Sequence, residues 1–248
     1  MALRAALATI WILAVVPACG GDSRAGSPNA LRVFAASSLT DAFEDLGAEF
    51  GSRSDGIEVS FVFGSSSDLV TQLEQGARAD VFASADEANM DRAVEAGVVD
   101  GDPQVFALNE LEIIVPPDNP GGIEELSDLT NDDLVVAICS PECPAGRYAL
   151  QVFDRAGISV TPDSFESGVR GVVTRVALGE ADAGIAYVSD TTTSGGVVVG
   201  IPIPDEVGVV AEYPTAALSD DRTADRWIDF VLSPHGQEVL TRYGFRSP

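Results

Sequence analysis

The chain has 248 residues, of which 46% are hydrophobic, so it can bury a substantial core and does not have the composition of a disordered protein. It carries 39 acidic residues against 14 basic ones, all of them arginine, for a formal net charge of −25. Such a surface repels nucleic acid and anionic lipid headgroups, so neither is expected as a partner, and an anionic ligand has to be bound by local donors.

The first residues predict export from the cytoplasm. Residues 1–18 have the pattern of a signal peptide, with Arg4 before an apolar stretch that is too short for a comfortable transmembrane helix. Ala18 directly before Cys19 resembles the lipobox of bacterial lipoproteins, which implies lipidation of Cys19 and anchoring to the cell membrane. The alternative is ordinary cleavage nearby and a soluble periplasmic protein. Residues 19–30 are small and polar and predict a flexible tether.

Residues 31–97 predict three successive units of strand and helix. Strands are expected at 31–35, 57–63 and 79–85, and each is followed by apolar residues at helical spacing. Repeated strand–helix units favour a parallel sheet that helices cover on both faces.

Two serine-rich corners fall between a strand and a helix of this region, at residues 35–40 and 63–68. Backbone N–H groups, a helix dipole and hydroxyl donors gather at such corners, which favours an oxyanion-binding cradle. The alternative is that the serines only cap helices, with Ser38 and Thr40 as the N-cap candidates of the first helix.

A second α/β unit follows from about residue 109. Its expected strands are at 111–115, 134–138, 183–187 and 197–203. Pro144 suits the first position of a helix, so Ala145 and Gly146 would present free N–H groups there. The chain is expected to cross back to the first unit near residues 212–214 and to end in two helices.

Seven separated motifs occur in order at fitting spacings: FAASSLT (34–40), GSSS (64–67), ADVFASAD (79–86), PAG (144–146), VRG (169–171), GIAYVSD (184–190) and RYGF (242–245). Together they resemble the molybdate-binding proteins of ABC importers, the substrate-binding subunits often called ModA. The resemblance covers roughly residues 31–246.

The resemblance implies an α/β, two-lobed periplasmic-binding-protein fold, in which each lobe is a mostly parallel sheet flanked by helices. Residues 31–108 with 213–248 would form one lobe and residues 109–212 the other. A monomeric, extracytoplasmic, lipid-anchored protein would close on molybdate or tungstate in the cleft and deliver it to an ABC permease. No catalytic activity and no cofactor are implied.

Carried over by motif position, the anion ligands of the family fall on Ser38, Ser66, Ala145, Val169 and Tyr187. The serines would donate through hydroxyl and backbone N–H, Ala145 and Val169 through backbone N–H, and Tyr187 through its phenol. The chain departs from the family at Gly168, where members often carry an acid, and at its two cysteines next to the PAG motif (144–146), which supplies the third anion-binding segment.

Those cysteines, Cys139 and Cys143, form an even pair once Cys19 carries lipid, which favours a disulfide in an oxidising compartment. A metal site is not expected, because His235 is the only histidine in the sequence. Arg170 is expected to have a structural or rim role, since a guanidinium would have to stay outside a site built of neutral donors.

Two other functions stay open at this point. One is a receptor for another oxyanion such as sulfate, or for a small organic acid. The other is an extracellular serine hydrolase with Ser38 or Ser66 as nucleophile, which would have to recruit His235 as its base.

Overall fold

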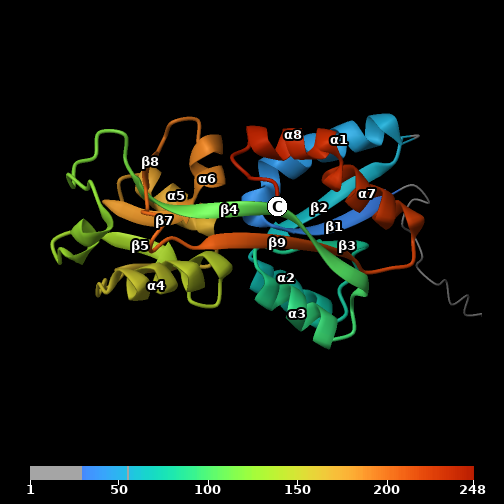
Figure 1. The fold of residues 1–248 in the computed structure, drawn as a ribbon, viewed down its shortest axis with the longest axis horizontal. Coiled ribbons are helices and arrows are strands. Elements are labelled where there is room, and N and C mark those ends of the chain that lie inside the picture. Colours follow the sequence, from blue (N-terminus) through green and yellow to red (C-terminus); the bar gives the residue numbers. More distant parts are fainter. Residues whose placement is uncertain (1–29, 55) are drawn as a thin grey trace, which may run out of the picture.

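The computed structural model describes residues 30–54 and 56–248 of the chain. The predicted signal peptide, Cys19 and all of the tether except Ala30 lie outside these residues. Two groups of helices and strands lie side by side, and two long strands run from one group to the other (Figure 1).

Within the described residues, nine strands are connected in the order β2-β1-β3-β9-β4-β7-β5-β6, with β8 paired to β4. They are β1 (Ala30–Ala36), β2 (Glu58–Gly64), β3 (Val81–Ala83), β4 (Asp100–Val115), β5 (Val136–Cys139), β6 (Ser164–Glu166), β7 (Ala183–Tyr187), β8 (Val199–Pro202) and β9 (Val210–Ala217).

Parallel pairs form the centre of each group, β1 with β2 and β3 in one, and β5 with β6 and β7 in the other. Every antiparallel pair among the described strands involves β4 or β9.

The strand β4 belongs to both groups. Its first part, up to Glu110, pairs with β9, whereas Leu111 begins the pairing with β7. The chain end closes the same region, since Leu108 and Arg246 form an antiparallel bridge. Bending of one group against the other therefore has to pass through β4 and β9.

The helices cover both faces of the sheet. The α-helices are α1 (Thr40–Arg53), α2 (Ser66–Glu74), α3 (Glu87–Glu95), α4 (Pro144–Ala156), α5 (Val169–Ala177), α6 (Val188–Thr193), α7 (Arg222–Leu232) and α8 (Pro234–Arg242). Two short 3-10 turns, η1 (Ser37–Leu39) and η2 (Leu126–Thr130), complete the described elements.

In the first group, α1, α7 and α8 lie on one face and α2 and α3 on the other (Figure 1). Fully buried Trp227 of α7 anchors the first face, with its ring edge-on to Phe43 at 5.5 Å and to Phe50 at 5.4 Å. The core on this face is continuous with that of the second group. The face under α2 and α3 has a smaller core around Phe34, Phe82 and Met90.

Several local expectations differ from the structure. The strand expected at 111–115 is only the last part of β4, which begins at Asp100. The third strand is shorter than residues 79–85, and the crossing segment near 212–214 is the eight-residue strand β9. The N-cap expectation for α1 is wrong, because η1 comes first and Leu39, without a side-chain cap bond, holds that position.

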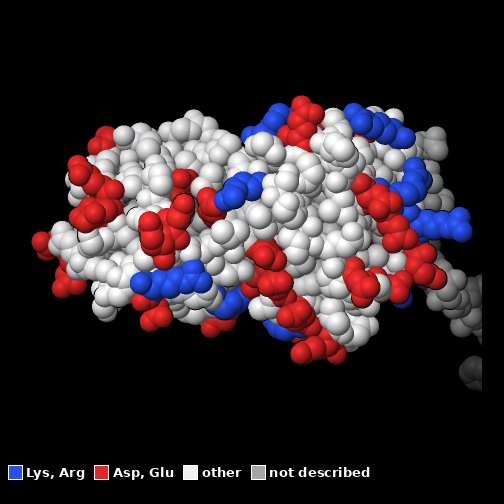
Figure 2. Space-filling model, in the orientation of Figure 1, with Lys and Arg blue, Asp and Glu red and all other residues white. Residues whose placement is uncertain are grey.

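Among the described residues, no helix has both the length and the apolar character needed to cross a membrane. On the face drawn in Figure 2, acidic side chains are scattered over both groups rather than gathered in one place.

Candidate functional site

One small pocket lies where the two groups meet. Its cavity volume is about 10 Å³. It is lined by Ala36, Ser37, Ser38, Gly64, Ser65, Ser66, Ala85, Cys143, Pro144, Ala145, Val169 and Tyr187. The five residues predicted as ligands are all in this set, so the fold brings together positions that are up to 149 residues apart in the chain, counted from Ser38 to Tyr187 (187 − 38).

Helix starts point several of these residues at the pocket. Ser66 and Val169 are the first residues of α2 and α5, and Ala145 is the second residue of α4. The first N–H groups of a helix have no partner within the helix, and the helix dipole places partial positive charge there. The pocket is therefore suited to an anion without any resident cation.

The side chain of Ser66 is oriented by a neighbour. Its Oγ accepts a hydrogen bond from the N–H of Ala85 at 2.9 Å. The N-cap of α2 is Ser65, whose Oγ accepts from the N–H of Asp68 at 3.2 Å. Ser66 is thus free of the capping role, and its own hydroxyl proton remains available to the pocket.

Ser38 lies in η1 rather than at the cap of α1. Its Oγ is 3.0 Å from the phenol oxygen of Tyr213 on β9, and both side chains are buried. The hydroxyl of Thr40 also does not cap α1, since it donates to the carbonyl of Ser37 at 2.7 Å.

The start of α4 depends on a close backbone approach. A Cβ on Gly146 would lie 2.1 Å from the carbonyl oxygen of Ser140, so only glycine fits. The structure joins Cys139 to Cys143 by a disulfide across this turn, and Cys143 is the N-cap of α4. The short bridge fixes the segment that presents the N–H of Ala145 to the pocket.

Tyr187 supplies an unmatched polar atom. The residue is 1% exposed, and its Oη has no hydrogen-bond partner among the described residues. Burial raises the pKa of Tyr187 well above its ordinary value, so the phenol keeps its proton and is a donor at neutral pH. A buried, unpaired hydroxyl beside a cavity indicates a missing acceptor.

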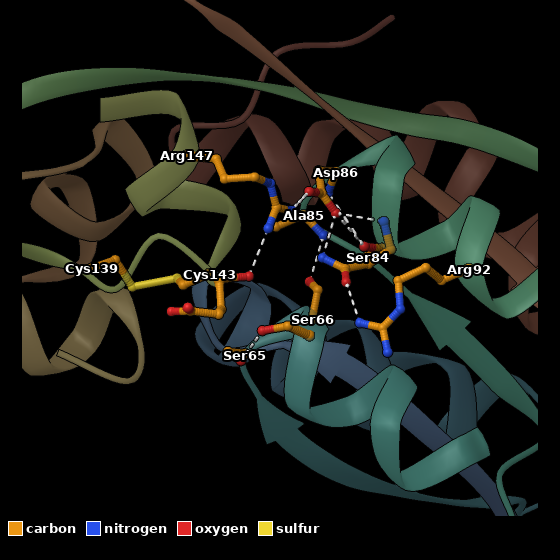
Figure 3. A network of polar contacts seen from close by, with 12 residues as sticks. Ser65, Ser66, Ser84, Ala85, Asp86, Arg92, Cys139, Cys143 and Arg147 are labelled. Atoms are coloured by element: carbon orange, nitrogen blue, oxygen red, sulfur yellow. Dashed lines mark hydrogen bonds and ion pairs between the residues drawn. A yellow bond between two sulfur atoms is a disulfide. The ribbon is translucent and has the colours of Figure 1, made fainter. Parts of the chain in front are cut away.

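Two arginines tie the groups together on either side of the pocket. Arg147 of α4 pairs with Asp86, whose side chain is 3% exposed and caps α3 (Figure 3). Arg170 of α5 pairs with Asp41 and donates to the carbonyl of Ser37 at 3.1 Å. Arg170 does not line the cavity, in agreement with the rim role expected for it.

Sequence reasoning missed Arg147 and Asp86 as a pair. Asp86 also caps α3, because its carboxylate accepts from the N–H of Asn89 at 3.1 Å. No pattern signals a partner 61 residues away. The only sequence signal for Arg147 is its place on α4, two residues after the predicted ligand Ala145.

The arrangement does not resemble a hydrolytic triad. His235 contacts Glu49 and lies 3.2 Å from the guanidinium of Arg53, on the α1–α8 side, rather than contacting Ser38 or Ser66. The part of the chain that the structure describes holds no cluster of three or more histidine, cysteine or acidic residues suited to a metal ion.

Comparison with known families places these features in context. The family model described as bacterial extracellular solute-binding protein matches residues 31–246. The molybdate-binding protein ModA of Mycobacterium tuberculosis (strain ATCC 25618 / H37Rv) is 38% identical over 256 aligned residues, which cover 99% of this chain and 98% of the relative.

Solved structures give the same fold. The periplasmic molybdate-binding protein of Azotobacter vinelandii has a TM-score of 0.76 at 20% identity, covering 88% of this chain and 99% of that chain. The sulfate-binding protein SubI from Mycobacterium tuberculosis H37Rv has a TM-score of 0.76 at 19% identity, covering 88% of this chain and 87% of that chain. The fold alone therefore does not choose between these two anions.

Asp190, the third residue of α6, gives a prediction on stability. Burial raises its pKa to about 7, although its carboxylate accepts a bond from the N–H of Tyr187. The folded state then binds a proton more tightly than the unfolded state. This residue's contribution to the free energy of unfolding is full below about pH 4 and falls as the pH rises toward 7, by at most about 1.4 kcal/mol per pH unit.

Urea unfolding of the unliganded wild type and Asp190→Asn at pH 5 and pH 8 measures this. The variant lacks the titration, so its stability relative to wild type should improve between the two pH values. Asp229→Asn, an exposed change on α7, is the control. A pH-independent difference between wild type and Asp190→Asn would contradict the prediction.

Proposed function

This chain belongs to the bacterial extracellular solute-binding proteins, among the ModA relatives, and on that premise we propose that it captures molybdate outside the cytoplasm and delivers it to an ABC importer. The same membership makes it a solute-binding protein and not an enzyme. The observation that carries the proposal is the unpartnered, buried hydroxyl of Tyr187 in a pocket walled by serine hydroxyls and helix starts.

The proposed ligands are the five residues of the resemblance. Ser38 and Ser66 donate from the first group of elements, and Ala145, Val169 and Tyr187 donate from the second. The anion then serves as the shared acceptor of both lobes, and no cofactor takes part. Tungstate has the same charge and shape and is the second proposed ligand.

Donor chemistry supports a fully deprotonated anion. Molybdate, tungstate and sulfate carry no proton near neutral pH, whereas phosphate still carries one and needs an acceptor. Each hydrogen bond to a charged group contributes about 1.5–3 kcal/mol, so a few convergent donors suffice for tight binding. The separation of molybdate from sulfate then depends on the size of the closed cavity.

We propose lobe limits at residues 31–108 with 213–248, and at 109–212. They place the hinge in β4 and β9, close to the change of pairing partner between Glu110 and Leu111. Closure by bending at these strands would be the signal that the permease reads.

Titration of the domain without its first 29 residues against molybdate, tungstate, sulfate and phosphate tests the function. We expect tight binding of the first two, weaker binding of sulfate and the weakest binding of phosphate, measured by calorimetry. Sulfate binding without molybdate binding would instead favour a sulfate receptor.

Tyr187→Phe and Ser66→Ala are the matched variants for this titration. Each removes one donor, so molybdate affinity should fall about 10-fold to 100-fold. The melting temperature of the unliganded protein should change little for Tyr187→Phe, because its hydroxyl has no partner among the described residues. Unchanged molybdate affinity of both variants would exclude this pocket as the site.

The pair of Arg147 and Asp86 gives a prediction on kinetics. Arg147→Gln leaves the buried carboxylate of Asp86 without its cation when the lobes close, so the closed state is weakened. We expect molybdate to dissociate about 10-fold to 100-fold faster, measured by stopped flow. Arg175→Gln, whose partners Glu166 and Glu180 lie within the second lobe, should keep the wild-type rate. Equal dissociation rates in the wild type, Arg147→Gln and Arg175→Gln would contradict the proposal that the pair of Arg147 and Asp86 stabilises the closed state.

We also propose that residues 1–18 are removed and that Cys19 carries the lipid anchor, on the evidence of the lipobox-like pattern before Cys19. The N-terminal peptide of the mature protein should have the mass of a diacylglyceryl-cysteine. Cys19→Ser should release the protein from the membrane fraction. An unmodified N-terminal peptide from the wild type would overturn this proposal.

A further inference from the structure

The two serines proposed as ligands, Ser38 and Ser66, share one feature. The hydroxyl oxygen of each contacts a hydroxyl or amide group of the chain itself. Behind Ser66 this group is the N–H of Ala85, which can only donate. The proton of Ser66 therefore cannot point backward, and the residue can offer it to the pocket.

Behind Ser38 the partner is the phenol of Tyr213, which can donate or accept. The direction of this bond decides whether Ser38 presents a proton or a lone pair to the pocket. It therefore decides whether the site takes a bare oxyanion or a protonated one.

The side chain of Asn109 fixes the direction. Its Nδ2 lies 2.8 Å from the hydroxyl of Ser189 and 3.4 Å from Oη of Tyr213. Its Oδ1 accepts from the N–H of Glu110 at 3.0 Å, which would be lost if the amide were turned over. The group facing Tyr213 is thus the NH₂ end, which only donates.

The proton count follows. Tyr213 has one hydroxyl proton and cannot give it to an amide NH₂. The phenol of Tyr187 packs nearby but forms no hydrogen bond with it, so Tyr213 donates to Ser38. Ser38 then accepts from Tyr213 and has its own proton left for the pocket, in the same way as Ser66.

We infer that Asn109 and Tyr213 are positioning residues that hold Ser38 as an obligate donor and thereby select oxyanions that carry no proton. This inference rests on the proposed function, because it assigns the specificity of the same pocket.

Burial makes this set of hydrogen bonds effective in holding the direction of the Ser38 hydroxyl. Ser38, Asn109, Ser189 and Tyr213 are each at most 8% exposed, so water cannot easily take the place of a missing partner. Tyr213 and Asn109 lie on the crossing strands, where Ala107 faces Tyr213 and Asn109 faces Ala211. The chain of bonds thus runs from the first lobe, through both hinge strands, to α6 of the second lobe.

Tyr213→Phe tests the inference, because it keeps the ring that packs edge-on against Phe106 and Phe245 and removes only the hydroxyl. Ser38 is then free to accept from a ligand. We expect molybdate affinity to fall about tenfold while phosphate affinity changes less than about twofold, so that the affinity ratio shrinks about tenfold. Tyr243→Phe removes a phenol that bonds Asp45 outside the pocket and should leave the ratio unchanged.

Asn109→Asp reverses the direction, since a carboxylate accepts from Tyr213 and turns the lone pair of the phenol toward Ser38. Its loss of molybdate affinity should exceed that of Tyr213→Phe, to about 100-fold. In the Tyr213→Phe background the added loss should be much smaller, because the relay of hydrogen bonds from Asn109 through Tyr213 to Ser38 is already absent. A purely electrostatic effect of the new charge would instead be the same in both backgrounds.

The outcomes separate the two proposals. Wild-type binding of molybdate with an unchanged molybdate-to-phosphate ratio in Tyr213→Phe, or additive losses in the double variant, overturns the relay alone. Wild-type binding of sulfate without molybdate overturns the proposed ligand, and the relay is then tested by the sulfate-to-phosphate ratio. A wild type that binds none of these anions overturns both.

Discussion

The structure depends on the match between a buried set of donors and an acceptor that the described chain does not supply. In the closed pocket, Tyr187 keeps an unpaired hydroxyl, and the starts of α2, α4 and α5 present N–H groups that their own helices cannot satisfy. Burying such groups without partners is unfavourable, so lobe closure and binding of the proposed anion would stabilise each other. Most other local features of the site hold these donors in place: Gly146 lets the backbone approach, the Cys139–Cys143 bridge fixes the turn, and the Ala85 N–H orients Ser66.

The crossing strands make this match a property of both lobes. A binding site on one lobe would be insensitive to closure, whereas under the proposed lobe limits β4 and β9 would act both as the hinge and as the support of the site. Tyr213 of β9 reaches Ser38 in the first lobe, and Asn109 of β4 reaches Ser189 in the second. A bend at these strands would therefore move the two lobes together with the hydrogen bonds between Ser38, Tyr213 and Asn109. Coupling of this kind needs only packed side chains whose hydrogen bonds have a fixed direction, not a separate signalling element.

The sequence predicted the parts of the fold that local patterns carry. Strands with apolar runs and helices with periodic apolar residues are close to their expected positions. The length of β9 was missed because Pro214 interrupts a strand pattern, and Pro is disfavoured within strands. Ala145 and Val169 came from the resemblance alone, since backbone donors leave no side-chain signal. The contacts of Ser38 with Tyr213 and of Arg147 with Asp86 join residues 175 and 61 positions apart, which no local pattern encodes.

A net charge of −25 is at first sight a poor basis for binding a dianion. On the face drawn in Figure 2 the acidic groups are spread out, however, and in physiological salt their fields fade over about 8 Å. Near the pocket, the charge of exposed Arg170 is matched by Asp41, and that of half-buried Arg147 by Asp86. The wall of the closed cavity is therefore close to neutral, and short-range donor geometry decides what binds. Such a site can be selective because each donor must find an acceptor atom, a condition that a simple excess of positive charge does not impose.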